Sequence, residues 1–273
     1  MTMREKARSA VLLTSAVFAP LTCGAQAPPL PAPADMKVIG LVGGTSWYST
    51  VEYYRNINQA VNEAYHNNTN PPLILYNLNQ QRIHQLQAQG DWAAIADLLT
   101  DAVAHLQAAG AQAVIFCANT PHKVYGLVAQ RAGVPILHIA DATGAAIHRL
   151  GLTKVGLIGT LYTMEDGFIA DRLRTRYGVD TITPSSPESR SELHRIIQKE
   201  LALGIFKAKS KLFILGQIEE LRRRGAQGIV LGCTEFPLII KSGEIALPVF
   251  DTTQLHSQMA VDFILGRTVE AQR

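Results

Sequence analysis

Two cysteines in this chain each end an apolar stretch and precede residues that commonly start helices. Cys117 closes the stretch that begins at Gly110, and Cys233 closes the stretch that begins at Gly225. The two glycines are 115 residues apart and the two cysteines are 116 apart. A repeat at this interval indicates two similar half-domains built from alternating strands and helices. If the halves face each other about a pseudo-two-fold axis, the two thiols lie on opposite sides of one cleft.

A thiol at the start of a helix lies beside unpaired backbone N–H groups, which favour the thiolate. We therefore expect Cys117 and Cys233 to have a lowered pKa and to act as general base and general acid. Such a pair suits the removal of a proton from one face of a carbon and its return to the other. Removing an α-proton from an amino acid also requires hydrogen-bond donors for the carboxylate. Small or hydroxyl-bearing residues stand at the expected strand-to-helix turns: Gly43, Gly44, Thr45, Asn119, Thr120, Gly159, Thr160 and Thr234.

Other interpretations of the two cysteines remain open. Buried single cysteines are often ordinary core residues. A disulfide between Cys117 and Cys233 would join the halves in an oxidising compartment and abolish acid–base chemistry. Metal binding is not favoured, because three cysteines and eight histidines show no paired ligand spacing. A dinucleotide site is not favoured either, since the glycines at 40, 43 and 44 do not have the GxGxxG spacing.

The remaining polar residues near the cysteines give weaker signals. Glu235 follows Cys233 and Thr234 directly, so it could cap its own helix or assist catalysis. His122 is expected on an exposed helix start. Three further histidines are expected to be structural: His138, His148 and His256.

Composition describes a globular protein without a nucleic-acid or membrane partner. The formal net charge is +3, and without residues 1–25 the chain carries 22 basic and 21 acidic residues. It has no run of Lys and Arg, so we expect neither nucleic acid nor an anionic membrane as partner.

The first residues have the pattern of a secretory signal. A basic start precedes an apolar stretch from Ala10 to Leu21, and a small-residue cleavage site ends at Ala25. Residues 28–33 are a proline-rich tether. We therefore expect a periplasmic or secreted protein. The alternative is that Met36 is the true start and the protein is cytoplasmic.

The rest of the chain alternates between apolar strands and amphipathic helices, which predicts parallel sheets with helices on both sides. Expected strands cover residues 37–42, 72–77, 135–140 and 154–158, together with the stretches ending at Cys117 and Gly232. Expected helices include 166–177, 188–203 and 207–224. We predict an α/β fold of two pseudo-symmetric Rossmann-like half-domains with the active site in the cleft between them. Residues 1–35 form the leader and tether, 36–143 the N-terminal domain with 251–273 packing back onto it, and 144–250 the C-terminal domain.

Four motifs resemble the aspartate/glutamate racemase family, over nearly the whole chain after the leader. They are Gly43-Gly-Thr-Ser-Trp-Tyr-Ser-Thr50, Cys117-Ala-Asn-Thr120, the stretch from Gly159 to Met164, and Gly232-Cys-Thr-Glu235. Glu235 resembles the aspartate and broad-specificity branch, because glutamate racemases usually have His at this position. The wider superfamily, which shares the fold, includes decarboxylases, hydantoin racemases and maleate isomerases.

The resemblance implies a racemase that needs no cofactor, PLP included, and no metal. Cys117 and Cys233 would carry the proton on opposite faces of the α-carbon. Asn119, Thr120, Thr160 and Thr234 would hold the α-carboxylate, with Thr45 and Glu235 also at the substrate. Its substrate would be aspartate, glutamate or a similar small polar amino acid, and the protein would be a homodimer. The alternatives are a racemase or isomerase of a related acid, such as a hydantoin or maleate, and a non-catalytic exported solute-binding protein.

Overall fold

The computed structural model describes residues 29–267. The expected signal segment, residues 1–27, and the last six residues of the chain lie outside this range. A short 3-10 helix, η1 (Pro33–Asp35), precedes the first strand.

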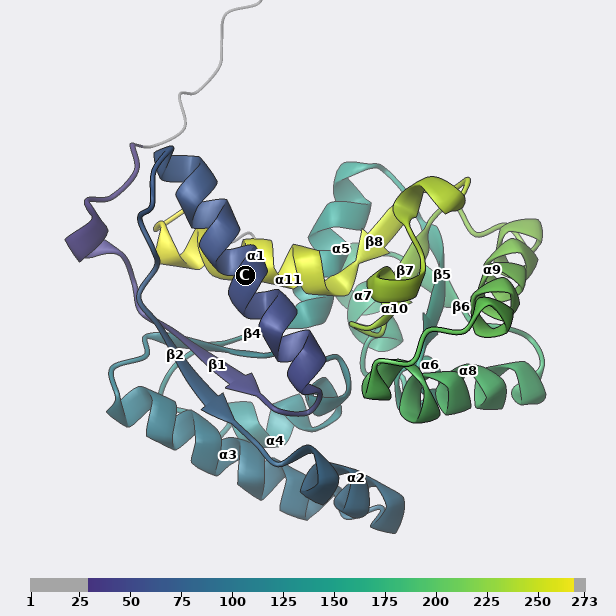
Figure 1. Cartoon of the computed structure of the whole chain (residues 1–273), viewed down its shortest axis with the longest axis horizontal. Helices are drawn as coiled ribbons and strands as arrows, with labels where there is room; N and C mark the ends of the chain where they lie inside the picture. The colour runs from purple at the N-terminus through teal and green to yellow at the C-terminus, as the bar shows by residue number, and fades with distance from the viewer. Residues whose placement is uncertain (1–28, 268–273) are drawn as a thin grey trace, which may run out of the picture.

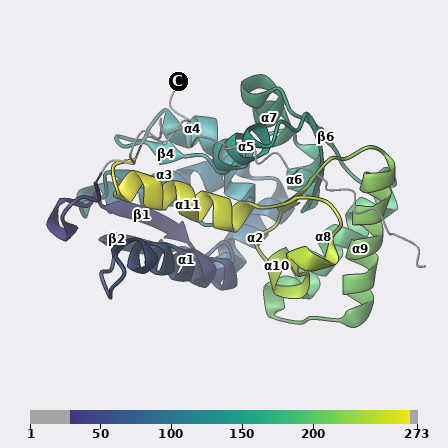
Figure 2. The ribbon, with the colours of Figure 1, turned by 90° about the horizontal axis from the view of Figure 1, so that it is seen from above.

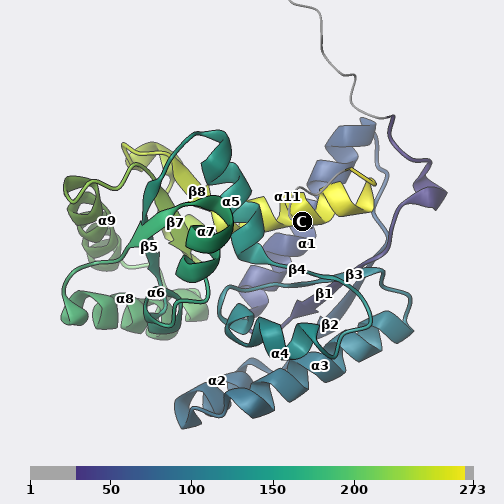
Figure 3. The same ribbon diagram turned by 180° about the vertical axis from the view of Figure 1, so that it is seen from behind.

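The first half contains a parallel sheet of four strands in the order β2-β1-β3-β4. The strands are β1 (Ile39–Gly43), β2 (Leu73–Asn77), β3 (Ala113–Phe116) and β4 (Ile136–Leu137). The intervening helices are α1 (Trp47–Tyr65), α2 (Gln80–Gln89), α3 (Trp92–Ala108), η2 (Thr120–Val124) and α4 (Tyr125–Ala129). Helix α1 covers one face of this sheet, and α3 and α4 cover the other (Figures 1 and 3).

The second half repeats this arrangement with a parallel sheet in the order β6-β5-β7-β8. Its strands are β5 (Lys154–Gly159), β6 (Asp180–Ile182), β7 (Ile229–Gly232) and β8 (Val249–Asp251). Its helices are α6 (Leu161–Glu165), α7 (Ala170–Tyr177), α8 (Pro187–Lys199), η3 (Leu201–Leu203), α9 (Ala208–Arg223), α10 (Phe236–Ile239) and η4 (Ser242–Glu244). The identical strand order confirms the predicted pair of pseudo-symmetric α/β halves.

Two helices connect the halves. Helix α5 (Ile139–Arg149) packs against α7 of the second half and against α11 (Thr252–Ile264). Helix α11 starts at the end of β8, returns across the molecule and packs on α1 and β1 of the first half (Figures 1 and 2). The boundary that we expected between residues 143 and 144 lies inside α5, so the two halves share this helix.

The expected strand over residues 135–140 is shorter in the structure. Only Ile136 and Leu137 pair with β3, and α5 begins at Ile139. His138 causes this early change, because its Nδ1 accepts a hydrogen bond from the backbone N–H of Ala140 at 3.1 Å and so caps the helix.

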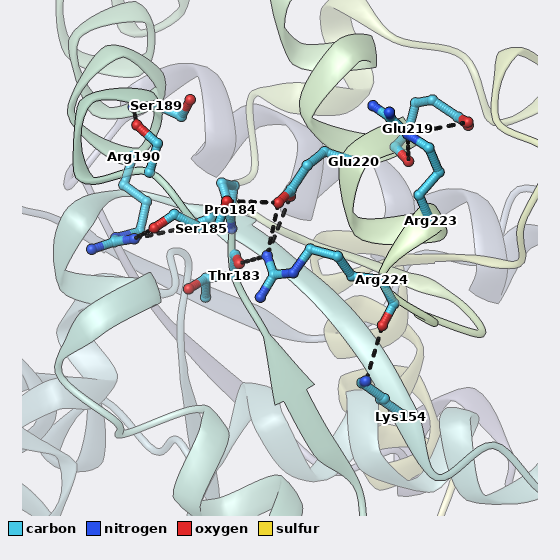
Figure 4. A network of polar contacts seen from close by, with 11 residues as sticks. Lys154, Thr183, Pro184, Ser185, Ser189, Arg190, Glu219, Glu220, Arg223 and Arg224 are labelled. Atoms are coloured by element: carbon cyan, nitrogen blue, oxygen red, sulfur yellow. Dashed lines mark hydrogen bonds and ion pairs between the residues drawn. The ribbon is translucent and has the colours of Figure 1, made fainter.

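A polar network holds the loop between β6 and α8 (Figure 4). The Arg224 guanidinium donates to the carbonyl of Thr183 at 2.7 Å and to the Glu220 carboxylate at 3.0 Å. Arg190 donates to the carbonyls of Pro184 and Ser185. These contacts are mostly exposed and add little stability each. They satisfy the carbonyls of the loop that leads into α8, which lines the cavity described below.

Across residues 29–267, no helix combines the length and apolar character needed to cross a bilayer.

Three histidines form a buried cluster where α5 and α11 meet η2. The ring of His122 lies 4.5 Å from that of His138 and 5.6 Å from that of His256, measured between ring centroids. His256 accepts a hydrogen bond from the Tyr53 hydroxyl at Nδ1 and donates from Nε2 to the carbonyl of Leu137, each at 2.9 Å. Burial lowers the pKa of all three rings, and that of His256 falls to about 4. The structural role expected for His138 and His256 agrees with these contacts.

We expect acid to unfold the protein through this cluster. The histidine pKa values are about 6.5 when unfolded, so below that pH the unfolded state binds protons that the folded state refuses. The free energy of unfolding should then change little between pH 7 and 8 and fall as the pH drops from 6.5 to 4, by about 1.4 kcal/mol per pH unit for each histidine that stays neutral in the folded state. Urea unfolding at a series of pH values measures this slope.

The variant His256→Gln should have a shallower slope, because one of the three groups no longer titrates. The exposed His148 is the matched control, and His148→Gln should keep the wild-type slope. Equal slopes in all three proteins would show that the cluster does not govern acid stability.

Candidate active site

A small cavity lies where the carboxyl ends of the central strands of both sheets meet. In open α/β sheets this edge is where ligands bind. The cavity has a volume of about 50 Å³. Seven residues expected at the site from the sequence line it: Thr45, Asn119, Thr120, Thr160, Cys233, Thr234 and Glu235.

The turn after β1 places Thr45 beside the cavity. Gly44 has a φ of +84°, and a Cβ atom there would lie 2.1 Å from the carbonyl oxygen of Leu78. Only glycine fits this backbone conformation without displacing the neighbouring chain. The N–H of Gly44 donates to the Thr50 hydroxyl at 3.0 Å, and Ser46 caps α1, so the turn is fixed on both sides of Thr45.

Two threonine hydroxyls meet across the boundary between the halves. Thr160 caps α6 by accepting a hydrogen bond from the N–H of Thr163 at 3.2 Å. Its hydroxyl lies 3.5 Å from that of Thr120, which follows β3 in the first half. Both side chains are buried and line the cavity, so they present hydroxyl groups from the two halves to one ligand.

Asn119 links the halves and leaves one atom free. Its Nδ2 donates to the Thr252 hydroxyl at 2.9 Å, and that hydroxyl donates to the carbonyl of Leu231 at 2.8 Å. Among the described residues, the buried Oδ1 of Asn119 has no hydrogen-bond partner. A buried acceptor without a partner is costly, so this oxygen is ready to accept a hydrogen bond from a ligand.

Cys233 and Glu235 form a buried pair at the end of β7. The Sγ of Cys233 donates to Oε2 of Glu235 at 2.9 Å, and the Thr234 hydroxyl donates to the same oxygen at 3.1 Å. Glu235 stands at the N-cap position of α10, but its carboxylate makes no capping bond there and turns toward the thiol. The cavity therefore holds a thiol with a carboxylate in position to take its proton.

The environment of Cys233 raises the pKa of its thiol, whereas the sequence led us to expect a lowered pKa. Burial contributes most, followed by the negative charge of Glu235 and the hydrogen bond to it. The N–H groups of Thr234 and Glu235 oppose this rise, as expected at a helix start, but α10 has only four residues. The backbone N–H groups therefore lower the pKa of the thiol as expected, but desolvation raises it by more.

Cys117 is not among the residues that line the cavity. Its side chain lies in the apolar cluster beneath α1 and α11, with Tyr53, Ile57 and Ala260, and it is 2% exposed. Burial raises the pKa of the Cys117 thiol far above its usual range. The neighbouring residue, Ala118, lines the cavity instead. Both cysteines are free thiols, so the disulfide that we left open between them is not present.

The sequence did not identify the residues contributed by α2 and α8. Helix α2 brings Gln80, His84 and Gln87 to the cavity, and α8 brings Ile197 and Gln198. Burial lowers the pKa of His84, and the Glu235 charge partly opposes this effect. A glutamine-rich helix without a cysteine or glycine motif gives no sequence signal for a site. His122, expected on an exposed helix start, is 2% exposed and belongs to the histidine cluster instead.

A second, larger cavity adjoins the first between α2 and α8. Its volume is about 490 Å³, and it shares His84, Gln87 and Gln198 with the small cavity. Within residues 29–267, no group of three or more His, Cys, Asp or Glu side chains is arranged to hold a metal ion.

The sequence matches the family model for Asp/Glu/hydantoin racemases over residues 42–260. A candidate Asp/Glu racemase from Yersinia pestis is 44% identical, with a TM-score of 0.78 over 84% of this chain and 100% of that one. An aspartate racemase homologue from Pyrococcus horikoshii is 35% identical, with a TM-score of 0.72 over 84% and 99% of the two chains. Glutamate racemase from Francisella tularensis, solved with D-glutamate, is 16% identical, with a TM-score of 0.57 over 88% and 85%, and shares the fold.

The contact between Cys233 and Glu235 predicts how the thiol reacts with an alkylating reagent. Replacing Glu235 with Gln removes the charge that raises the pKa of Cys233, so more thiolate forms at pH 7.5. We expect Glu235→Gln to be alkylated by iodoacetamide at Cys233 about tenfold faster or more, measured by mass spectrometry. Cys117 should stay unlabelled until the protein unfolds.

The exposed Glu244 provides a matched control, since Glu244→Gln removes a carboxylate that does not line the cavity. Its alkylation rate should equal that of the wild type. An unchanged rate in Glu235→Gln would contradict a pKa raised by this carboxylate.

Proposed function

The chain belongs to the Asp/Glu/hydantoin racemase family, and on that premise we propose that it is a cofactor-independent racemase of a small polar amino acid. The observation that carries this proposal is the buried Cys233–Glu235 pair, which lines a small cavity together with hydroxyl groups from both halves. A thiol with an adjacent base is the arrangement that activates cysteine for proton transfer or nucleophilic attack.

The residues at the cavity support a specific sequence of steps. Glu235 takes the thiol proton, and the resulting Cys233 thiolate removes the α-proton of the substrate. The electron pair left on the α-carbon is delocalised into the α-carboxylate, where the hydroxyls of Thr45, Thr120 and Thr160 can donate hydrogen bonds. Return of a proton from the Cys233 thiol to the α-carbon restores the amino acid.

Asn119 suits a different role from the one implied by family resemblance. One N–H of its Nδ2 is used by Thr252, whereas the buried carbonyl oxygen Oδ1 has no partner among the described residues and is open to a ligand. A carbonyl oxygen accepts hydrogen bonds, and the donor on an amino acid is its ammonium group. We therefore assign Asn119 to the substrate ammonium and leave the carboxylate to the threonines.

The charge of the lining also bears on the substrate. Among the described residues that line the small cavity there is no Lys or Arg, and the one carboxylate is Glu235. Three glutamines, at 80, 87 and 198, supply neutral hydrogen-bonding groups. A substrate with a second carboxylate would bring another negative charge into this small cavity, because the Arg and Lys side chains nearby, Arg195 and Lys199, line the adjoining larger cavity instead. These features favour an amino-acid substrate whose side chain is polar and uncharged.

Export and homodimer formation remain predictions from the sequence. Trp47, Val51 and Tyr54 lie at helical spacing on α1 and are each about half exposed, at 52%, 49% and 51%. This exposed apolar stripe is compatible with the expected homodimer.

The first test of the proposed reaction is α-proton exchange in deuterated water with a panel of small amino acids. Cys233→Ser should lower exchange by at least about 10³-fold, in the range of general acid–base contributions. Glu235→Gln should lower exchange by about 10²-fold although it favours the thiolate, because the thiol proton then has no carboxylate through which to exchange with solvent. Mass spectrometry of the recovered amino acid measures the exchange. Cys117→Ala is the matched control, since Cys117 lies outside the cavity, and it should stay within about twofold of wild type.

Exchange that survives Cys233→Ser would contradict the proposal. Ligand binding without exchange in the wild type would favour a solute-binding protein. Turnover confined to hydantoins or maleate would place the chain among isomerases of related acids.

A second test addresses the side chain of the substrate. We expect kcat/KM for asparagine or glutamine to exceed that for aspartate or glutamate at least tenfold, which is about 1.4 kcal/mol. Gln198→Lys should reduce this preference by adding a cation to the lining, whereas the uncharged Gln198→Met should not. A wild-type preference for the dicarboxylic amino acids would contradict our interpretation of the charge.

A further inference from the structure

The two halves present different residues at equivalent positions of the cavity. In the first sheet, β1 pairs Val42 with Phe116, so the next pair in register is Gly43 with Cys117. In the second sheet, β5 pairs Gly159 with Gly232. Gly43 and Gly159 end corresponding strands of the two sheets. Cys117 is therefore the counterpart of Gly232, and Ala118 is the counterpart of Cys233.

The packing of the two sheets gives the same correspondence. Val114 and Phe116 face α3, the helix that connects the edge strand β2 to β3. Ile229 and Leu231 face α9, which makes the same connection in the second half. Val114 and Ile229 are 115 residues apart, and so are Phe116 and Leu231. Ala118 and Cys233 are separated by the same interval. The interval of 115 between Gly110 and Gly225 belongs to the same repeat, and the interval of 116 between the cysteines does not.

The side chains near Ala118 provide no substitute for a thiol. His84 of α2 also lines the cavity from the first half, but the charge of Glu235 acts on its pKa, which places this ring toward the Cys233 side. The hydroxyls of Thr45 and Thr120 line the cavity as well. Within residues 29–267, neither hydroxyl has a carboxylate or histidine as hydrogen-bond partner, and the Thr120 hydroxyl pairs with that of Thr160. A hydroxyl without an adjacent base is a weak proton carrier. Cys233, in contrast, has Glu235 at 2.9 Å.

From this asymmetry we propose that proton transfer at the α-carbon is one-sided, with Cys233 serving one face and no side-chain acid serving the face beside Ala118. This inference rests on the proposed function and specifies its stereochemical course. On the Cys233 side, the thiolate takes the α-proton, the electron pair stays on the carbanion, and the thiol returns a proton to the same face. The proton exchanges with solvent through Glu235, so deuterium enters with retention of configuration. Inversion requires a proton from water on the Ala118 side and is slower.

The experiment measures exchange and inversion together, starting from each pure enantiomer of the best substrate in deuterated water. Mass spectrometry reports deuterium, and chiral chromatography reports inversion. For one enantiomer we expect exchange to exceed inversion at least tenfold, and for the other we expect little of either. Equal rates of exchange and inversion from both enantiomers would overturn the inference while leaving the proposed function standing. No exchange from either enantiomer would instead remove the proposed function on which the inference depends.

Ala118→Cys adds the missing thiol and should raise the ratio of inversion to exchange at least tenfold. Ala118→Ser is the matched control of similar size and should leave the ratio near the wild-type value. The wild-type ratio stands as a test even if Ala118→Cys folds poorly. Loss of inversion in Cys117→Ala, with exchange retained, would overturn the inference by showing that Cys117 is the second acid.

Discussion

The cavity depends on the alternation of side chains along two parallel strands. Successive residues of a strand point to opposite faces of its sheet, so a shift of one position moves a side chain from the cavity into the core. At the end of β3 this alternation directs Cys117 beneath α1 and leaves Ala118 at the cavity. At the end of β7 it places Cys233 at the cavity. A pseudo-symmetric fold thus carries an asymmetric set of reactive groups.

Burial is the second constraint, because it sets the protonation state of nearly every group near the site. Desolvation raises the pKa of both cysteine thiols and lowers that of His84, His122 and His256. The thiol of Cys233 is thus protonated at rest, and its activity requires a neighbouring acceptor. Glu235, two residues further along the chain, supplies that acceptor. Its negative charge raises the pKa of the thiol, and this effect ends once Glu235 has taken the thiol proton. Cysteine and glutamate therefore act as a unit.

The link between the halves is built from the same residues that line the cavity. Asn119 reaches the start of α11 through Thr252, and Thr120 meets Thr160. Helix α11 then packs back on α1, so the second half is tied to the first through the site itself and through the shared helix α5. Because both halves contribute hydroxyls to a cavity of about 50 Å³, a small displacement between them would change the geometry at the ligand.

The sequence alone determined the α/β class, the repeated halves, the family and seven residues of the cavity, because these depend on local periodicity, on turn residues and on motifs that are continuous in the chain. The sequence also indicates the asymmetry, because the repeated glycines Gly110 and Gly225 are 115 residues apart whereas the two cysteines are 116 apart. Only the tertiary structure decided which side chain at the end of β3 faces the cavity, because strand register is set by pairing with β1 and by packing beneath α3. It also decided the contribution of α2 and α8, the burial of His122 and the sign of the thiol pKa shifts. These depend on contacts between residues far apart in the chain, which no local pattern encodes.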